Sequence, residues 1–372
     1  MITRLSFILL FCLYSLSFGQ NDSGKQNRTA LAGMPSPQMI DDCLQDLPPT
    51  VVLDNSDREA PANTDSLEVE TKDEGLLPLE EFTIAGDPRY TIDASLPRKT
   101  NKLKPVTTAL VGGTYFGILG GLHVYQIKTI WNETRTFRFI EDGNQDFYSD
   151  KAGHFWGAYF ISYCSTEALI GSGFSFDNAF PYGGLMGFGY QMYVEIMDGF
   201  GKNWGFSTSD FIGDLAGSAY YLAQHYIPFL QNFTPKATYF PARWYNEKPR
   251  LEASSFIDDY SSRTWWMSVN VYNLLPQTWQ KYYPSWLELA FGYSVRDLRF
   301  DVTDYTYKGD KKFIIALDYN LGRLIPNTTN FLNWLRHCFN MFKFPAPAIE
   351  FGDKVKFNIF YPFKISTGNI SF

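Results

Sequence analysis

The residues best able to do chemistry are a histidine and several carboxylates that interrupt otherwise apolar segments. His154 follows Lys151 at the start of one apolar segment, and Glu195 lies late in another. Ionisable side chains in apolar helices are costly to bury, so they tend to be paired or functional. We expect one polar pocket formed by Lys151, His154, Gln191, Glu195, Asp198, Ser207, Asp210 and Asp214.

A histidine beside carboxylates can act as a general acid and base or bind a divalent metal. We therefore name His154, Glu195 and Asp198 as hypothetical catalytic residues, with His154 as the acid or base. The chain has no HExxH, GxSxG, Walker or EF-hand motif, so neither a metal nor a cofactor is predicted. The binding residues are predicted to be Lys151, Gln191, Ser207, Asp210 and Asp214.

The same residues also have a plain structural interpretation. Ser207 stands three residues before Asp210, which fits a capping box at the start of a helix. Lys151 could simply pair with Glu195 or Asp214. The spacing alone does not separate these interpretations from a functional site, so both stay open here.

Four apolar segments of helical length carry these residues, and together they predict a four-helix unit. Glycines recur at four-residue spacing in all of them, for example at Gly113 and Gly117 and again at Gly213 and Gly217. Small residues at that spacing let helix backbones approach closely, which is the packing favoured in lipid. A soluble, tightly crossed bundle is the alternative. The segments are 107–125, 152–170, 180–197 and 211–230.

The C-terminal part changes to aromatic-rich runs with a near two-residue period, which predict antiparallel strands. The predicted fold class is α+β: a glycine-rich bundle of about four apolar helices, then an antiparallel aromatic-rich β-sheet part with one amphipathic helix at Asn330–Lys343. A curved sheet packed on the bundle is favoured over a β-barrel-like outer-membrane pore, because too few strands are present to close an eight-stranded barrel. The strand runs are 265–274, 286–300, 313–324 and 354–363.

The N-terminus predicts export. A basic start precedes the apolar run Leu5–Leu16, and Ser17-Phe18-Gly19 forms a small-x-small site, so we expect a signal peptide cleaved after Gly19. The next segment is acidic and poor in aromatics, which predicts a mostly disordered tether. The predicted domains are the signal peptide at 1–19, the tether at 20–104, a helical domain at 105–234, a connection or lid at 235–262 and a β-rich part at 263–372.

The composition of the chain limits the classes of molecule that it is expected to bind. The formal charge of -7 at pH 7 argues against nucleic-acid binding, because that affinity depends on neutralising phosphates. Aromatic residues make up 18% of the chain, and aromatics are enriched at membrane interfaces. Contact with membrane lipid or another envelope component is therefore favoured, and a protein partner stays unknown. The cysteines have no CxxC spacing, which argues against a disulfide framework or a zinc site.

Several motifs resemble the YfiM-type domain, a family of predicted periplasmic proteins of unknown function. The resemblance covers about residues 105–363. It starts at Phe137-Arg138-Phe139-Ile140-Glu141-Asp142 and Asp150-Lys151-Ala152-Gly153-His154-Phe155, and it continues through Val194–Phe200, Trp204–Phe211 and Asp214–Gly217. The later part, at Trp265–Asn270, resembles the longer versions found in Bacteroidota. The family usually has Asn where this chain has Asp214. Many members are predicted lipoproteins, whereas the residues before Cys12 are too bulky for a lipoprotein processing site.

The order Asp-Lys…His, then Glu, then Ser-x-x-Asp also resembles, more distantly, VanZ-like membrane proteins, which implies a polar pocket within the membrane. We therefore expect an exported protein, periplasmic or associated with the outer membrane, that binds a lipid, glycan or protein partner through this pocket. The alternative is a membrane-associated hydrolase or transferase that acts on a lipid-linked envelope substrate through His154 with Glu195 and Asp198. The sequence leaves open whether the chain is an enzyme.

Overall fold

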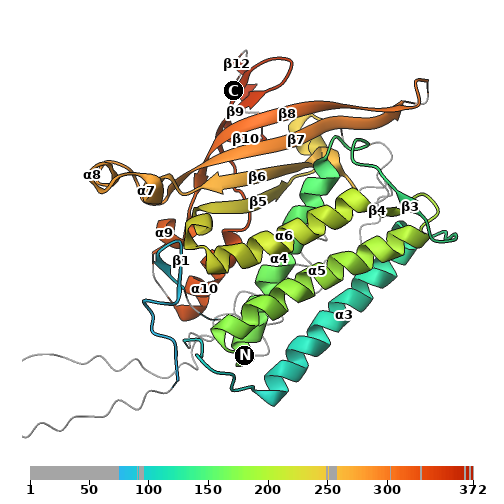
Figure 1. The fold of residues 1–372 in the computed structure, drawn as a ribbon. Coiled ribbons are helices and arrows are strands. Elements are labelled where there is room, and N and C mark those ends of the chain that lie inside the picture. Colours follow the sequence, from blue (N-terminus) through green and yellow to red (C-terminus); the bar gives the residue numbers. More distant parts are fainter. Residues whose placement is uncertain are drawn as a thin grey trace, which may run out of the picture. The chain divides into compact units, whose positions relative to one another are not determined.

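The computed structural model describes part of the chain, and within that part it has a mixed α+β fold with an antiparallel sheet (Figure 1). The predicted signal peptide, its cleavage site and most of the predicted tether lie outside the described residues. These are 75–371 without 90, 92–95, 249, 251–257, 302, 327–328, 364–365 and 368–369.

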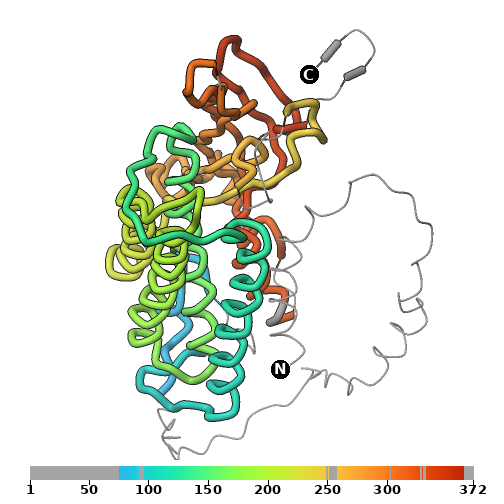
Figure 2. Tube along the Cα trace, turned by 90° about the vertical axis from the view of Figure 1, so that its right-hand side faces the viewer, coloured from blue at the N-terminus to red at the C-terminus, as the bar shows by residue number. Residues whose placement is uncertain are grey.

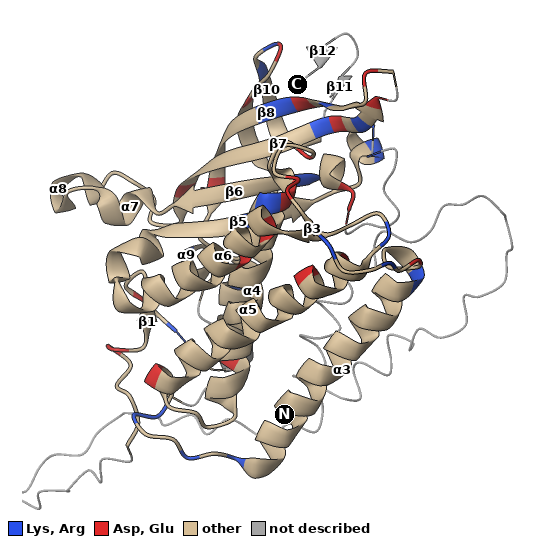
Figure 3. Ribbon diagram, turned by 45° about the vertical axis from the view of Figure 1, so that its right-hand side comes forward, with Lys and Arg blue, Asp and Glu red and all other residues tan. Residues whose placement is uncertain are grey.

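Four long helices form at the four apolar segments. Figure 3 shows them mostly uncharged along their lengths. Side-chain caps fix two of the starts: Ser175 Oγ accepts a hydrogen bond from the Asn178 N–H, and Ser207 Oγ accepts one from the Asp210 N–H. The capping role inferred for Ser207 is therefore confirmed. The helices are α3 (Pro105–Thr129), α4 (Ser149–Gly171), α5 (Phe176–Phe200) and α6 (Thr208–Tyr226).

Helices α4, α5 and α6 pack closely where glycines of one helix face a neighbouring helix. A Cβ added at Gly183 would lie 2.0 Å from Thr166 Oγ1, and one at Gly217 would lie 2.0 Å from the Phe155 carbonyl oxygen. Helix α3 runs alongside α5 (Figure 2), where Tyr115 OH donates to the Met186 carbonyl at 2.8 Å. Its glycines have no atom within 4 Å of an added Cβ. The close approach predicted for all four helices is thus found in three of them.

Six strands form an antiparallel meander in the order β10-β9-β8-β7-β6-β5. Strands β6, β7, β8 and β10 confirm four predicted strands, while β5 and β9 were not predicted. Strand β5 falls partly in the segment predicted to be a connection or lid. It was not predicted as a strand because Pro235 and Lys236 are uncommon in the interior of a sheet. Pro is tolerated at edge strands. The strands are β5 (Phe233–Tyr239), β6 (Arg263–Val269), β7 (Leu287–Asp301), β8 (Thr306–Tyr319), β9 (Ala346–Phe351) and β10 (Lys356–Tyr361).

Shorter elements connect these parts. The predicted amphipathic helix is confirmed as α10 (Asn330–Phe339), shorter than expected because Met341–Lys343 turns to pair with Ala237 of β5. The remaining helices are α7 (Val271–Leu274), α8 (Gln277–Gln280), α9 (Leu321–Leu324) and the 3-10 turns η1 (Pro228–Asn232), η2 (Ala242–Tyr245) and η3 (Tyr260–Ser262). The short strands are β1 (Thr83–Ile84), β2 (Asp87–Pro88), β3 (Phe139–Ile140), β4 (Phe206–Ser207), β11 (Ser366–Thr367) and β12 (Ile370–Ser371).

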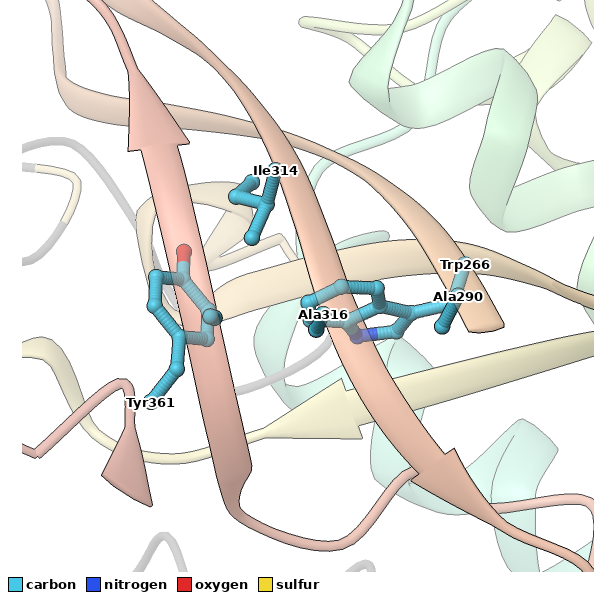
Figure 4. Close-up of a cluster of buried hydrophobic side chains, with 6 residues drawn as sticks. Trp266, Ala290, Ile314, Ala316 and Tyr361 are labelled. Carbon is cyan, nitrogen blue, oxygen red and sulfur yellow. The ribbon is translucent and has the colours of Figure 1, made fainter. Parts of the chain in front are cut away.

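The curved sheet buries one face around a small hydrophobic cluster. Trp266 of β6 packs edge-on against Tyr361 of β10, with ring centroids 5.7 Å apart (Figure 4). Ala290, Ile314 and Ala316 fill the space between them. Small alanines on neighbouring strands let the two aromatic rings meet across the sheet.

Part of the predicted tether packs against the helices. Phe82 is completely buried and meets the Phe176 ring edge-on at 5.5 Å between centroids. Arg89 forms a buried ion pair with Glu167 of α4. Asp87 forms a second ion pair, with Arg323. An aromatic anchor and two ion pairs therefore hold the end of a segment whose average composition predicts disorder.

Candidate functional site

The structure surrounds His154 of α4 with carboxylates. Its Nδ1 lies 2.9 Å from Asp214 Oδ1 on α6 and 3.6 Å from Glu195 Oε1 on α5. Its Nε2 lies 3.5 Å from Asp150 Oδ1 and 3.8 Å from Asp210 Oδ1. We call His154 with these four carboxylates the His154 cluster; three helices therefore contribute to one buried polar site.

Lys151 neutralises one side of the His154 cluster. Its Nζ lies 2.6 Å from Asp142 Oδ1, 2.9 Å from Asp150 Oδ2 and 2.6 Å from Asp210 Oδ1. All these groups are mostly buried, where an ion pair is retained only if its geometry and hydrogen bonds are good. Lys151 thus ties Asp150 and Asp210 together and leaves Glu195 and Asp214 to His154.

Hydrogen bonds orient the carboxylates. Gln191 Nε2 donates to Asp214 Oδ1 at 3.0 Å, and the Ser207 backbone N–H donates to Glu195 Oε2 at 3.1 Å. Tyr260 OH, from η3, donates to Asp150 Oδ1. Each of these contacts joins different elements, so the orientation of the site depends on the packing of the whole helical part.

Two local features bring the elements together. Strand β3 pairs with β4 in parallel, with Ile140 opposite Ser207, so that Ser207 Oγ reaches Asp142 Oδ1 at 2.7 Å. On α6, a Cβ added at Gly213 would lie only 3.1 Å from the Lys151 carbonyl oxygen. Glycine at this position lets α6 approach α4 closely enough for Asp214 to reach His154.

Burial and mutual charge set the protonation of the His154 cluster. Burial raises the pKa of Glu195 to about 9. Burial, followed by the charge of Asp150, raises the pKa of Asp210 to about 8. Burial opposes the charged form of His154, but Asp150 and Asp214 together hold its pKa well above the usual value. At neutral pH, without further ligands, the cluster therefore holds a charged imidazole beside a protonated Glu195.

The pKa of Asp150 is shifted in the opposite direction from those of Glu195 and Asp210. Burial on its own would raise the pKa of Asp150, but the charges of His154 and Lys151 outweigh it and lower that pKa. The carboxylates of one cluster thus differ in protonation. This is the arrangement from which acid and base roles are assigned in active sites.

All but one of the predicted site residues meet in this region. The exception is Asp198, which accepts a hydrogen bond from Trp131 Nε1 at 2.5 Å. Burial raises the pKa of Asp198 to about 7. Three residues of this region were not among the predicted site residues: Asp142, in the loop after β3, Asp150, and Tyr260, for which the sequence carries no signal. Asp150 could have been placed with His154 from its spacing of four residues in a helix.

The two described cavities lie away from the His154 cluster. One, of about 360 Å³, lies between α4 and the sheet and is lined by apolar side chains such as Phe155, Trp156 and Trp265. The other, of about 550 Å³, is lined by residues near Asn273 and Arg323. Neither is lined by His154 or by its carboxylates, so any substrate of this site needs a route other than these cavities.

Comparison with known proteins gives one family match. Residues 139–224 match a family described as a predicted periplasmic lipoprotein (DUF2279). The matched segment runs from β3 to α6 and includes every residue of the His154 cluster. Curated proteins gave no match, and solved structures gave none. The resemblance to an uncharacterised periplasmic family is confirmed, and no finding supports the more distant resemblance to VanZ-like proteins.

Proposed function

We propose that the chain is a membrane-associated protein of the cell envelope that binds lipid through its apolar outer surfaces. The premise is that residues 139–224, which build the His154 cluster, match a family described as predicted periplasmic lipoproteins. The observation that carries this proposal is the apolar, exposed face of the sheet. A periplasmic location agrees with the family description; lipid contact is the further step.

One row of side chains across the sheet is apolar and about half exposed. Phe291, Ile315, Ile349 and Phe357 are paired in register on β7, β8, β9 and β10, and they are 47%, 39%, 40% and 57% exposed. The next row, on the opposite face, is buried and consists of Ala290, Ala316, Ala348 and Asn358. The larger apolar side chains thus point outward, as they do in sheets that face lipid.

The buried face of the sheet carries charge. Lys236 Nζ lies 2.9 Å from Asp318 Oδ2 and 3.2 Å from Glu288 Oε2. Ser268 Oγ donates to the same two carboxylates, at 2.7 Å to Asp318 and 2.8 Å to Glu288. A water-soluble sheet places its apolar face inward and its charged face outward. Here the exposed face is apolar, and the buried face holds these charges beside the hydrophobic cluster of Trp266 and Tyr361. An apolar outer face supports contact with an apolar medium.

Helix α3 supports the same proposal. Among the described residues it is the one helix long and apolar enough to cross a membrane, and only 11% of its most apolar window is buried within the protein. Its 25 residues suffice for the roughly 20 that span a bilayer core. Val106 and Phe116 are among its exposed side chains. Lipid would remove these side chains from water.

Fractionation and vesicle binding test the proposal. The chain should remain in the membrane pellet after carbonate extraction and enter solution only with detergent. The triple substitution Phe291→Ser, Ile315→Ser and Phe357→Ser should reduce co-flotation of the purified protein with phospholipid vesicles at least several-fold. The control Tyr282→Ser alters an exposed aromatic outside the row and should leave flotation unchanged. Full release by carbonate, or equal flotation of the triple variant, would remove the basis of the proposal.

A second candidate is acid–base catalysis on a lipid-linked envelope substrate. The separation of 3.6 Å between His154 Nδ1 and Glu195 Oε1 lies within the reach of one water, as concerted proton transfer requires. His154→Gln and Glu195→Gln should then retain folded yield while the cellular phenotype of a deletion is not complemented. Full complementation by both variants would exclude this candidate.

A further inference from the structure

Three carboxylate oxygens of the His154 cluster have no hydrogen-bond partner among the described residues, and one of them, Asp210 Oδ1, lies 2.6 Å from Lys151 Nζ in an ion pair. The other two are Glu195 Oε1 and Asp214 Oδ2, and their side chains are 1% and 0% exposed. Buried polar atoms are almost always satisfied, so each exception calls for an explanation such as an absent ion or water. Both belong to side chains that face the same nitrogen of His154.

We propose that His154, Glu195 and Asp214 bind one divalent transition-metal ion, with zinc as the best fit. Each ligand comes from a different helix: α4, α5 and α6. Metal sites in helical proteins are built in this way, from inward side chains on facing helices. One imidazole and two carboxylates also match the three protein ligands of an open zinc site.

The distances suit this assignment. Zinc bonds to nitrogen and oxygen of roughly 2.0–2.2 Å place neighbouring tetrahedral ligands roughly 3.4 Å apart. Glu195 Oε1 lies 3.6 Å from His154 Nδ1, and Asp214 Oδ1 lies 2.9 Å from it. Asp214 therefore has to withdraw by only a few tenths of an ångström, or turn its unpartnered Oδ2 toward the metal.

The surrounding hydrogen bonds match a metal site as well. A metal-binding histidine usually donates its other ring N–H to a carboxylate, and His154 Nε2 lies 3.5 Å from Asp150 Oδ1. Gln191 holds Asp214 Oδ1 at 3.0 Å, and the Ser207 N–H holds Glu195 Oε2 at 3.1 Å. Both carboxylates are thus oriented through one oxygen while the other remains available.

The Nε2 side of His154 is a weaker candidate for the metal site. Asp150 and Asp210 also lie close enough to His154 Nε2 to form a ligand set. However, Lys151 Nζ already lies 2.9 Å from Asp150 and 2.6 Å from Asp210. A built-in cation there would repel a metal ion. The side of Glu195 and Asp214 has no such charge, so we assign the metal to it.

Metal binding at this site carries its own chemical signature. The ligands must be deprotonated, so binding releases protons and weakens as the pH falls. The imidazole ligand favours zinc over calcium and magnesium, which prefer sites made only of oxygen ligands. Two carboxylates balance the charge of the ion. This inference is independent of lipid binding by the sheet.

The test uses the tag-free, full-length mature chain in detergent, stripped with a chelator. Titration with zinc chloride in a calorimeter should show one ion bound per chain, with proton release seen as a heat that depends on the buffer. Calcium chloride should give no saturable binding. Glu195→Gln and Asp214→Asn should each weaken zinc binding more than about 100-fold. Gln191→Ala removes no proposed ligand but removes the hydrogen bonds to Asp214 and to the His154 carbonyl, and it should weaken zinc binding about 10–100-fold.

Asp198→Asn is the matched control, because Asp198 is a buried carboxylate that contacts Trp131 and not His154. It should bind zinc as the wild type does. Circular dichroism identifies any variant that fails to fold, and Gln191→Ala keeps the test decisive if the ligand variants do fail. The proposal is overturned if the wild type binds no zinc, if Gln191→Ala binds it unchanged, or if Asp198→Asn loses it.

Discussion

The contact between α4 and α6 yields the sharpest stability prediction, for Gly217→Ala. The added Cβ would lie 2.0 Å from the Phe155 carbonyl oxygen, whereas real Cβ contacts stay beyond 3.0 Å. The two backbones must therefore separate by about 1 Å. Overpacking costs about 1–3 kcal/mol. The cost here should lie at the top of that range, about 3 kcal/mol, because a helix backbone is the obstacle that yields least. Alanine regains up to about 1 kcal/mol of helix propensity, which leaves a net destabilisation of about 2–3 kcal/mol.

Thermal unfolding in detergent, followed by near-ultraviolet circular dichroism, measures this effect. At about 2–4 °C per kcal/mol for a protein of this size, Tm should fall by roughly 4–12 °C. Gly117→Ala in α3 is the control, because no atom lies within 4 Å of its added Cβ, and its Tm should stay level or rise slightly. Equal Tm values for the two variants would refute the close approach of α4 and α6.

Three further predictions concern charge. Lys151→Met leaves three carboxylates without their lysine partner and should lower the unfolding free energy by about 3–5 kcal/mol. The control Lys202→Met, at an exposed pair with Glu133, should change the unfolding free energy by less than about 1 kcal/mol. Similar effects of the two variants in urea unfolding would contradict the burial of Lys151. In the metal-free protein, burial raises the pKa of Glu195 to about 9 from 4.5, so folding takes up a proton and stability should fall as pH rises from 5 to 9. Glu195→Gln should flatten that fall, and an unchanged profile would show that Glu195 is ionised in the folded state.

The helices were predictable because their signal is local. Length, apolar composition and the Ser207 cap are all visible within one segment. The sequence did not show which helices pack closely. Gly217 lies against the backbone of a neighbouring helix and Gly117 does not, although each follows another glycine by four residues. That difference depends on the tertiary arrangement, which four-residue spacing does not encode.

The sheet was harder to predict, because its buried face holds charged side chains. Lys236 reads as a solvent-facing residue, yet it is fully buried in an ion pair, and so β5 escaped prediction. For the site, the convergence of His154, Glu195 and Asp214 followed from ionisable groups on apolar helices. Tyr260 could not be found in this way, because it approaches from a segment more than one hundred residues further along the chain.

The central claim is that His154 is buried among carboxylates from three helices. Nuclear magnetic resonance of the imidazole tests it most directly, with the metal-free protein and with the His154→Gln variant to identify the signal. We predict that the His154 ring titrates well above pH 6.5, because Asp150 and Asp214 outweigh the effect of burial and raise its pKa. Titration near pH 6.5, the value of an unperturbed histidine, would contradict the account.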